Sequence, residues 1–448
     1  MLNLYEQKSL RVGAVCGAAL ACFTWSGQLF AAGFSEIKDE HPKHFNFSVG
    51  AKTEFSDNAT KTLVDTVDER QDVYDIDLSG AWSASLVAIE ADYNFKERVF
   101  SESSEPDLST VEGEATVRVL PDRPFFGSIM HSRRRVLTGP AEIALFGNFD
   151  NRDILRGEAG LALSLSSVDT LSFVPYVTNI EFGEDTGLDS ERVGGDLRWR
   201  RQMSKTNEIN VVGAIFESTH EEPERSYDYE RWLVGYQVSL RRIRYRVDVG
   251  INKIMPELGD NVDGPFYDVS IEYAGNTHQL AFSASQELTD SSMGNGSDGR
   301  ESSFSIRSAS GGNADQIKVE EYEIEYSFHG PCARCEVSAN ITSTKESYIN
   351  LIDRDTKEEK GALKLTYKFS PKTTLIFKGG ILDTEFRRST YSDYRETKGE
   401  IKLQYKPGKH WVFSLFATIE KRNNDELLND FHDDYSEKIQ GVSIRYRL

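Results

Sequence analysis

Residues 438–448 close the sequence and read Lys-Ile-Gln-Gly-Val-Ser-Ile-Arg-Tyr-Arg-Leu. Successive side chains of an extended strand point to opposite faces, so this stretch separates into an apolar face and a small or basic face. The apolar face holds Val442, Ile444, Tyr446 and Leu448, and the other holds Gly441, Ser443, Arg445 and Arg447. A frayed tail would not alternate in this way. We therefore predict that the chain ends in a β-strand that is paired within a sheet.

This terminal pattern resembles the last strand of bacterial outer-membrane β-barrels, in which apolar and aromatic residues alternate after a glycine. In that family the barrel-insertion machinery recognises the last strand, which also pairs with the first strand to close the barrel. The resemblance implies an insertion signal composed of Gly441, Ile444, Tyr446 and Leu448.

The composition fits such a barrel better than it fits a soluble domain. The chain of 448 residues has 72 acidic and 52 basic side chains, yet it also carries 25 Phe, 19 Tyr and 5 Trp. High charge alone would suggest disorder, but disordered segments lack aromatic residues. In a membrane barrel only alternate strand residues meet lipid, while the lumen and loops are polar. The net charge of −20 argues against a nucleic-acid partner, because phosphate binding needs a basic face.

The N-terminus has the features of a secretory signal. Lys8 and Arg11 precede an apolar run over residues 12–25, and small residues follow at 31–33. We predict a signal peptide over residues 1–33, a periplasmic lead over 34–44 and a barrel over 45–448, with the protein in the outer membrane of a Gram-negative bacterium. Outer-membrane lipid would then be its first partner.

Alternation of apolar and polar residues recurs along the rest of the chain. Phe45, Phe47 and Val49 alternate with Asn46 and Ser48, and similar rows continue as far as residues 411–419. We count about 20 segments of the length that a tilted strand needs to cross a membrane. The predicted fold is all-β, a transmembrane antiparallel up-and-down β-barrel of about 20 strands, with 18 as the alternative.

Short and long connections also alternate, as they do in barrels with short periplasmic turns and long external loops. The third long connection, residues 133–153, is unusually apolar, so we expect it either to fold into the lumen or to pack at the surface. Residues 290–313 are rich in Gly, Ser, Asn and Asp, which predicts a mobile loop.

Two cysteines lie outside the signal segment, Cys332 and Cys335, within Gly-Pro-Cys-Ala-Arg-Cys. In an oxidising compartment this spacing allows a disulfide at a turn. A redox motif would need a strand followed by a helix, whereas a strand-like stretch follows Cys335. We predict a disulfide that staples a turn. One cysteine pair makes a poor metal site, and we expect neither a metal nor a cofactor.

Charged residues occupy the strand faces that we expect to line the lumen. The predicted basic lining is Arg118, Arg134, Arg156, Arg198, Arg200, Arg244, Arg246, Arg445 and Arg447. The predicted acidic lining is Asp75, Asp77, Glu90, Asp92, Glu112, Glu114, Glu321, Glu323 and Glu325. Arginine rows in a wet lumen would attract carboxylate or phosphate groups and favour anions. Alternatively, the acids and bases pair across neighbouring strands and only stabilise the barrel.

One further resemblance concerns the end of the first strand, where residues 54–59 read Glu-Phe-Ser-Asp-Asn-Ala. This segment is similar to the aromatic-[Ser/Thr]-Asp-Asn segment of barrels associated with exopolysaccharide and PEP-CTERM (exosortase) systems. The resemblance implies a role in surface polysaccharide production or export, with the polysaccharide or polysaccharide-export proteins as partners.

The expected function is a porin-like pore for a hydrophilic polymer or solute. The alternative is a non-conducting structural or surface-interaction barrel that its third loop plugs. A lipid-modifying enzyme at the barrel rim is a weaker alternative, because the scattered histidines mark no Ser/His/Asp arrangement and we assign no catalytic residue.

Overall fold

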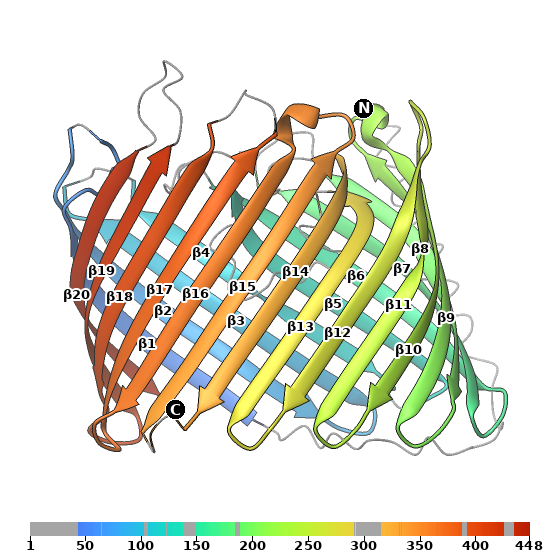
Figure 1. Ribbon diagram of the computed structural model, residues 1–448, viewed down its shortest axis with the longest axis horizontal. Coiled ribbons are helices and arrows are strands. Elements are labelled where there is room, and N and C mark those ends of the chain that lie inside the picture. Colours follow the sequence, from blue (N-terminus) through green and yellow to red (C-terminus); the bar gives the residue numbers. More distant parts are fainter. Residues whose placement is uncertain are drawn as a thin grey trace.

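The chain folds into one β-barrel of 20 antiparallel strands (Figure 1). The structure is a computed structural model, and it describes residues 44–63, 65–102, 106–121, 123–137, 149–183, 189–290, 292, 315–330, 332, 334–387, 392–424 and 434–448. The predicted signal peptide and nearly all of the predicted lead segment lie outside these residues. His44, which we placed in the lead, already belongs to the first strand.

Each strand pairs with its neighbours in chain order. The first ten strands are β1 (His44–Ser56), β2 (Glu69–Ser83), β3 (Val87–Phe100), β4 (Leu108–Val119), β5 (Phe125–Leu137), β6 (Phe149–Ser164), β7 (Asp169–Phe182), β8 (Ser190–Gln202), β9 (Asn207–His220) and β10 (Tyr227–Ser239). The others are β11 (Ile243–Pro256), β12 (Val262–Ala274), β13 (His278–Asp290), β14 (Gln316–His329), β15 (Cys335–Tyr348), β16 (Thr356–Lys368), β17 (Thr373–Phe386), β18 (Tyr394–Tyr405), β19 (Trp411–Asn424) and β20 (Tyr435–Arg447). Two 3₁₀ helices, η3 (Pro223–Arg225) and η5 (Ile352–Arg354), lie in long connections.

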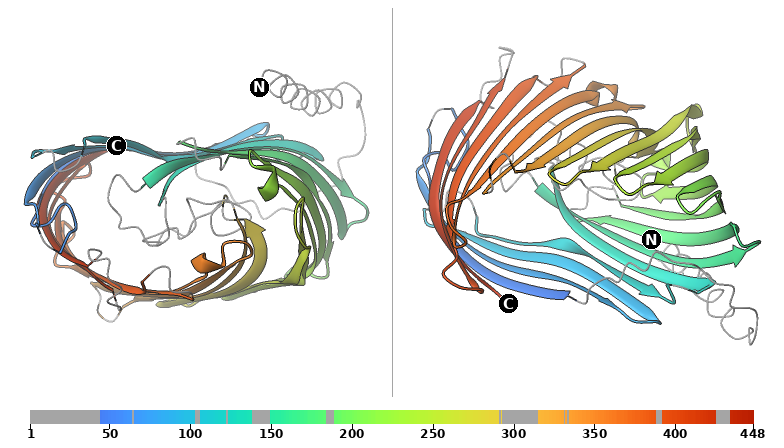
Figure 2. Two further views of the ribbon diagram at one scale, coloured as in Figure 1. Left: turned by 90° about the horizontal axis from the view of Figure 1, so that it is seen from above. Right: turned by 60° about the horizontal axis from the view of Figure 1, so that its bottom comes forward.

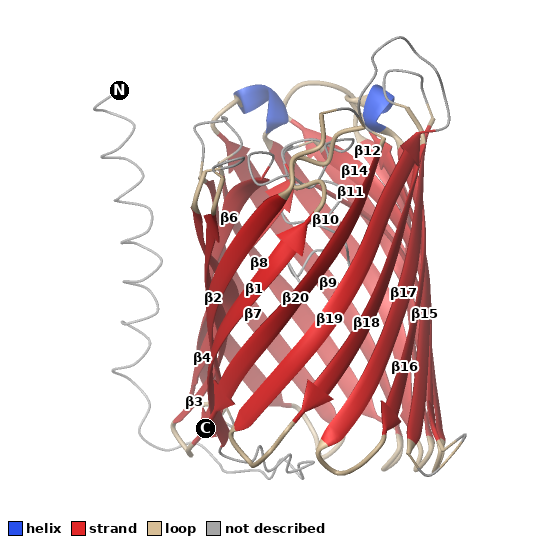
Figure 3. Ribbon diagram, turned by 90° about the vertical axis from the view of Figure 1, so that its left-hand side faces the viewer, coloured by secondary structure: helices blue, strands red, loops and turns tan. Residues whose placement is uncertain are grey.

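The last strand pairs with the first and closes the sheet, so the sequence-based fold prediction is confirmed (Figure 3). The β1–β20 ladder runs from the pair Ser48 and Arg447 to the pair Ser56 and Ile439. Closure removes the two edges that an open sheet of this size would expose.

The two faces of the wall differ in polarity, as the alternation requires. Apolar side chains such as Ile251, Leu415 and Ile419 are exposed on the outer face. Residues of opposite parity point to the lumen, the space that the strands enclose, and these are mostly polar or charged. The barrel is elongated rather than circular when viewed along its axis (Figure 2). In the part of the chain that the structure describes, no helix is long and apolar enough to cross a membrane.

The strands reach further into the long connections than the sequence pattern predicts. We assigned residues 133–153 to one loop, but β5 continues to Leu137 and β6 begins at Phe149. Polar residues on both faces end the apolar alternation there, while the backbone ladder continues. The direction in which the loop itself folds lies outside the described residues. Asp290, expected at the start of a mobile loop, is instead the buried end of β13.

Candidate functional site: the charged lumen

A cavity of the lumen lies against strands β5 to β13 and has a volume of about 610 Å³. Four guanidinium groups line it, those of Arg198, Arg200, Arg231 and Arg246. Arg198 and Arg200 share one face of β8 because they are two residues apart. Within the described residues no carboxylate lies within ion-pair distance of either of these two side chains. Glu208, Asp268 and Glu287 also line the cavity, and Arg231 and Arg246 lie within ion-pair distance of Glu287 and Asp268. The part of the wall around Arg198 and Arg200, which we call the arginine wall, therefore presents two guanidinium groups that have no close carboxylate partner among the described residues.

A second cavity of about 300 Å³ adjoins the arginine wall and shares Arg231 with it. Its lining adds Arg118, Arg156 and the aromatic ring of Tyr176. The Arg156 guanidinium stacks 3.9 Å from the centre of the Tyr176 ring. Its Nε atom also donates to Glu158 at 2.7 Å. Arg156 is therefore held in place by a ring and a carboxylate, unlike Arg198 and Arg200.

Several predicted lumen charges pair with one another. Arg445 contacts both Asp75 and Asp77. Arg134 lies 3.4 Å from Glu114, and Arg244 lies 2.6 Å from Glu272. Arg246 pairs with Asp248 of its own strand and lies 3.9 Å from Asp268 of β12, and Glu323 accepts a hydrogen bond of 2.7 Å from Asn340 of β15. These residues fit the interpretation that cross-strand pairs stabilise the wall.

Other predicted lumen charges have no ion-pair partner within 4 Å among the described residues. The unpaired bases are Arg118, Arg198, Arg200 and Arg447, and the unpaired acids are Glu90, Asp92, Glu112, Glu321 and Glu325. The adjacent unpaired bases lie on β8, whereas the acids lie on β3, β4 and β14. The two signs of uncompensated charge are thus partly segregated around the wall.

The end of β13 folds onto the inner wall instead of continuing its ladder with β12. Pairing between these strands stops at Tyr267 and Gln286, although β13 remains paired with β14 as far as Asp290. We call residues 286–290 the strap. Leu288 of the strap is only 3% exposed and packs on Tyr229 and Ile254. The strap therefore lies inside the barrel, over β10 and β11 (Figure 2).

Asp290 anchors the strap in a buried charged cluster. Its carboxylate pairs with Arg192 of β8 and accepts a hydrogen bond of 2.6 Å from the Tyr227 hydroxyl. The Ser292 hydroxyl donates to the same carboxylate at 2.6 Å. The His220 Nε2 atom lies 3.8 Å away. The pair joins residues 98 positions apart and crosses from one strand to a strand five places along the wall.

The seam between β1 and β20 contains the predicted insertion signal. Ile444 and Leu448 are exposed on the outer face, where Tyr446 packs edge-on against Trp411 at 4.9 Å between ring centres. Gly441 lies on the inner face, where an added Cβ would be 2.5 Å from the Thr53 carbonyl oxygen. Only glycine fits this close approach of the two closing strands.

The segment that carries the exopolysaccharide resemblance lies at this seam and fastens it. The Ser56 hydroxyl donates to Glu437 at 2.6 Å, and the backbone amide of Lys438 donates to Asp57 at 2.7 Å. The Asn58 amide nitrogen donates to the carbonyl oxygens of Thr62 and Ser436. We call residues 56–58 the clasp. All three polar side chains of the clasp are engaged by the barrel itself.

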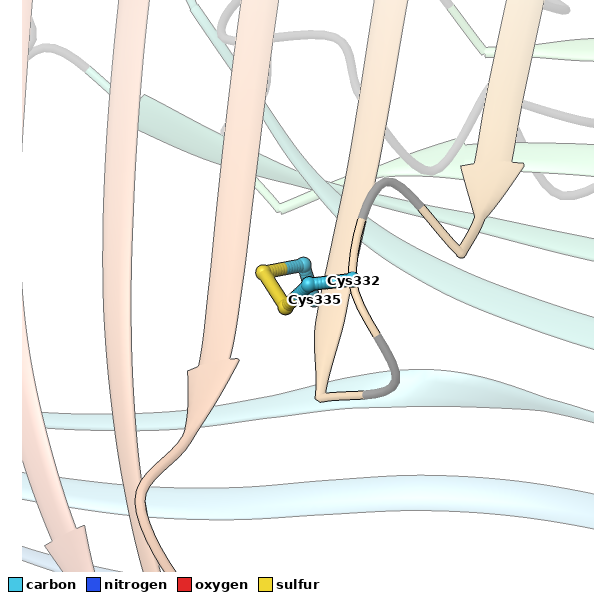
Figure 4. Close-up of a disulfide and its surroundings, with 2 residues drawn as sticks. All are labelled: Cys332 and Cys335. Atoms are coloured by element: carbon cyan, nitrogen blue, oxygen red, sulfur yellow. A yellow bond between two sulfur atoms is a disulfide. The ribbon is translucent and has the colours of Figure 1, made fainter.

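Cys332 and Cys335 form a disulfide in the turn between β14 and β15 (Figure 4). Their Cα atoms are 5.1 Å apart. Gly330, which precedes them, has a φ of +132°, a conformation that favours glycine. The turn is therefore shaped by a glycine and tied by a covalent bond.

Sequence reasoning missed Arg192, Arg231 and Asp290. Arg192 has the same parity as Arg198 and Arg200, so the alternation of β8 could have identified it. Arg231 was hidden because most of its inward-facing neighbours on β10 are apolar or aromatic. Asp290 gave no signal, since its partner is distant in the sequence and the strand bends only in the folded barrel.

The described histidines do not form a Ser–His–Asp relay. His220 comes closest, but neither of its ring nitrogens has a hydrogen-bond partner, and the Ser292 hydroxyl donates to Asp290 instead. Among the described residues, no group of His, Cys, Asp and Glu could hold a metal ion.

No protein-family model matches the chain, and no curated protein matches it. Several solved structures are similar in shape. OccK2 (OpdF) of Pseudomonas aeruginosa is 11% identical, with 90% of this chain and 98% of that chain covered and a TM-score of 0.39. OmpT of Vibrio cholerae, lacking its loop L8, is 10% identical, with 91% and 99% covered and a TM-score of 0.35. OccAB3 of Acinetobacter baumannii is 8% identical, with 91% and 100% covered and a TM-score of 0.39. Likeness at this level carries no functional information.

Proposed function

We propose that the chain is a pore in the outer membrane of a Gram-negative bacterium and passes hydrophilic solutes, with a preference for anions. The observation that carries the proposal is the arginine wall, where Arg198 and Arg200 line a cavity of about 610 Å³ without a carboxylate partner among the described residues. Guanidinium groups that are not neutralised attract anions, and several weak contacts in a row allow a solute to leave again.

The membrane location rests on the outer face of the barrel. Large apolar side chains cover that face on every part of the wall, and a soluble protein rarely exposes apolar surface of this extent. Lipid outside and water inside satisfy both faces. Outer-membrane lipid and the insertion machinery that recognises the last strand are the partners that this location requires.

We propose that the pore passes a hydrophilic polymer or a smaller solute that takes part in surface polysaccharide production or export. The support for this proposal is the resemblance of residues 54–59 described above, and partner proteins of polysaccharide export follow from the same resemblance. Because the clasp residues contact β20 and not the cavity, we expect the cavity and not the clasp to determine which solute passes.

The charge-reversed variant Arg198→Glu/Arg200→Glu tests the pore in planar bilayers. We expect large single-channel conductance from the refolded wild type, and a shift of the reversal potential toward cation preference in the variant. The matched control is Arg241→Glu/Arg242→Glu, which reverses two charges in the exposed turn between β10 and β11. No conductance from a correctly folded barrel, or equal shifts in both variants, would contradict the proposal.

A non-conducting structural barrel is the second candidate, and the strap is the observation that favours it. Residues 286–290 already occupy part of the lumen on the inner wall. Silent bilayers with folded protein would support this candidate. We propose no catalytic role; a lipid-modifying rim enzyme would require lipid turnover by the purified barrel, and its detection would overturn a passive role.

A further inference from the structure

We propose that the strap is a releasable gate beside the arginine wall, and that the Arg192–Asp290 ion pair is its latch. The inference rests on the proposed pore, because a gate has a role only if solute passes the lumen. It concerns the regulation of that pore and not its ion preference.

The strap is positioned to control the width of the lumen. Leu288 and Thr289 line the cavity of about 300 Å³, which shares Arg231 with the larger cavity of the arginine wall. A solute that moves between these cavities passes Arg231. Movement of the strap away from β10 and β11 would therefore widen the space next to this side chain.

The strap keeps its five ladder pairs with β14, and a small set of side-chain contacts holds it in its docked position. Glu287 lies 3.8 Å from the Arg231 guanidinium. Gln286 donates to the Pro265 carbonyl oxygen at 2.9 Å, and the Asn252 side chain hydrogen-bonds the backbone of Leu288. Leu288 supplies the apolar contact. The ion pair of Asp290 with Arg192 is the one charged contact that reaches β8. A charge-assisted hydrogen bond of this kind is among the stronger non-covalent contacts in proteins.

Buried polar atoms without a partner lie around the anchor of the strap. Arg192 and His220 approach Asp290, and Thr178 and Ser190 are their ladder partners. Thr178 Oγ1, Ser190 Oγ, Arg192 Nε and both ring nitrogens of His220 make no hydrogen bond within the described structure. Thr178, Ser190 and His220 are each at most 4% exposed. Buried polar atoms without partners oppose the state that buries them, and water would satisfy them if the strap lifted. The docked state thus depends on its latch.

A second resting place for the strap exists on the wall. The segment Val262–Phe266 of β12 pairs with β11 on one side, but its pairing with β13 has already ended. Its backbone groups can pair with the strap as a continuation of the β12–β13 ladder, except at Pro265, which has no N–H and whose carbonyl oxygen already accepts from Gln286. The released strap would then join the wall and leave the lumen.

Thiol labelling measures release without relying on conductance. Leu288→Cys places a thiol on the strap, and Cys332 and Cys335 are bonded to each other. We expect a hydrophilic maleimide to label this variant slowly in the folded barrel. Adding Asp290→Asn should accelerate labelling at least ten-fold. The matched control, Asp383→Asn, removes a carboxylate that pairs with Arg395 on the outer side of β17 and should change nothing. Equal rates with and without Asp290→Asn would overturn the proposal.

A milder variant guards against misfolding. Tyr227→Phe removes one hydrogen bond to Asp290 and should accelerate labelling two- to five-fold, and the shift of folded barrels on unheated gels verifies folding. If Asp290→Asn does not fold, Tyr227→Phe provides the test instead. An unchanged labelling rate in Tyr227→Phe would then overturn the proposed latch.

Conductance then separates this inference from the pore itself. Larger unitary conductance in Asp290→Asn, together with faster labelling, supports the gate. Conducting channels with unchanged labelling would overturn the gate and leave the pore. If neither the wild type nor Asp290→Asn conducts, although Asp290→Asn accelerates labelling, the proposed pore is overturned, and the gating role with it.

Discussion

At the seam, residues 57–63 of the first long connection pack against β19 and β20, whereas on another part of the wall the strap packs against β8, β10 and β11. Both segments bring a charged side chain to a buried partner of opposite sign. Lys61 lies 2.7 Å from Glu420, and Asp290 pairs with Arg192. The surroundings of the two pairs differ in how well polar groups are satisfied.

The seam satisfies most of its polar groups, with the Glu437 Oε2 atom as an exception. Asn58 is 1% exposed, and both its amide oxygen and its amide nitrogen are hydrogen-bonded. Glu420 accepts from Lys61, Lys398 and Tyr435. Around Asp290, by contrast, five polar atoms have no partner within the described structure. A fully satisfied network holds one geometry, while an incompletely satisfied one favours a second state that admits water. We infer that the seam is permanent and the strap is not.

The largest expected effect concerns the clasp. Asn58→Ala removes three side-chain hydrogen bonds from a buried site, so we expect the free energy of unfolding to fall by about 3 kcal/mol. Urea unfolding in lipid vesicles measures it. Asn46→Ala on β1 is the control, because Asn46 is exposed and makes one long bond of 3.4 Å. Equal losses in the two variants would contradict a special role for the clasp.

Substituting an arginine at the seam should lower stability, whereas substituting one on the arginine wall should change ion preference. Arg445→Gln leaves Asp75 and Asp77 without their shared cation. Asp75 is buried, but Arg445 and Asp77 are each about a third exposed, so we expect a loss of about 1 kcal/mol. Arg198→Gln should leave stability unchanged and weaken anion preference. Unfolding and reversal potentials of both variants provide the test, and a stability loss in Arg198→Gln would remove the distinction.

For the strap, we expect a smaller global effect than its burial suggests. Removing one partner of a sealed ion pair costs about 3–5 kcal/mol. If the strap lifts and water reaches Arg192, Asp290→Asn should cost less than about 1 kcal/mol in global unfolding, because local release replaces the buried unpaired charge. A loss in the full range for a sealed pair would show that the strap is as permanent as the seam.

The smallest expected change is the response of ion preference to salt. The screening length falls from about 10 Å at 0.1 M to about 3 Å at 1 M ionic strength. Anion preference that arises from Arg198 and Arg200 should therefore weaken as salt rises, whereas stability from the paired seam should change little. Reversal potentials at several salt concentrations measure this, and a salt-independent preference would indicate selection by size.

The sequence by itself determined the fold because period-two alternation dictates which face of each strand meets lipid, and this holds for the last strand as for the rest. Parity also placed Arg198, Arg200 and Arg445 on the inner face, and cysteine spacing placed the disulfide. Strand ends were less accurate, since backbone pairing continues where apolar alternation stops, as at Leu137 and Phe149.

Only the tertiary structure decided which charges remain unpaired, because pairing depends on the register of strands far apart in the chain. Arg445 meets Asp75 and Asp77 only once β20 closes on β1. Arg192 meets Asp290 only because β13 leaves β12 and bends inward. Alternation specifies the side of the wall on which a residue lies, but it does not specify its neighbour across the lumen.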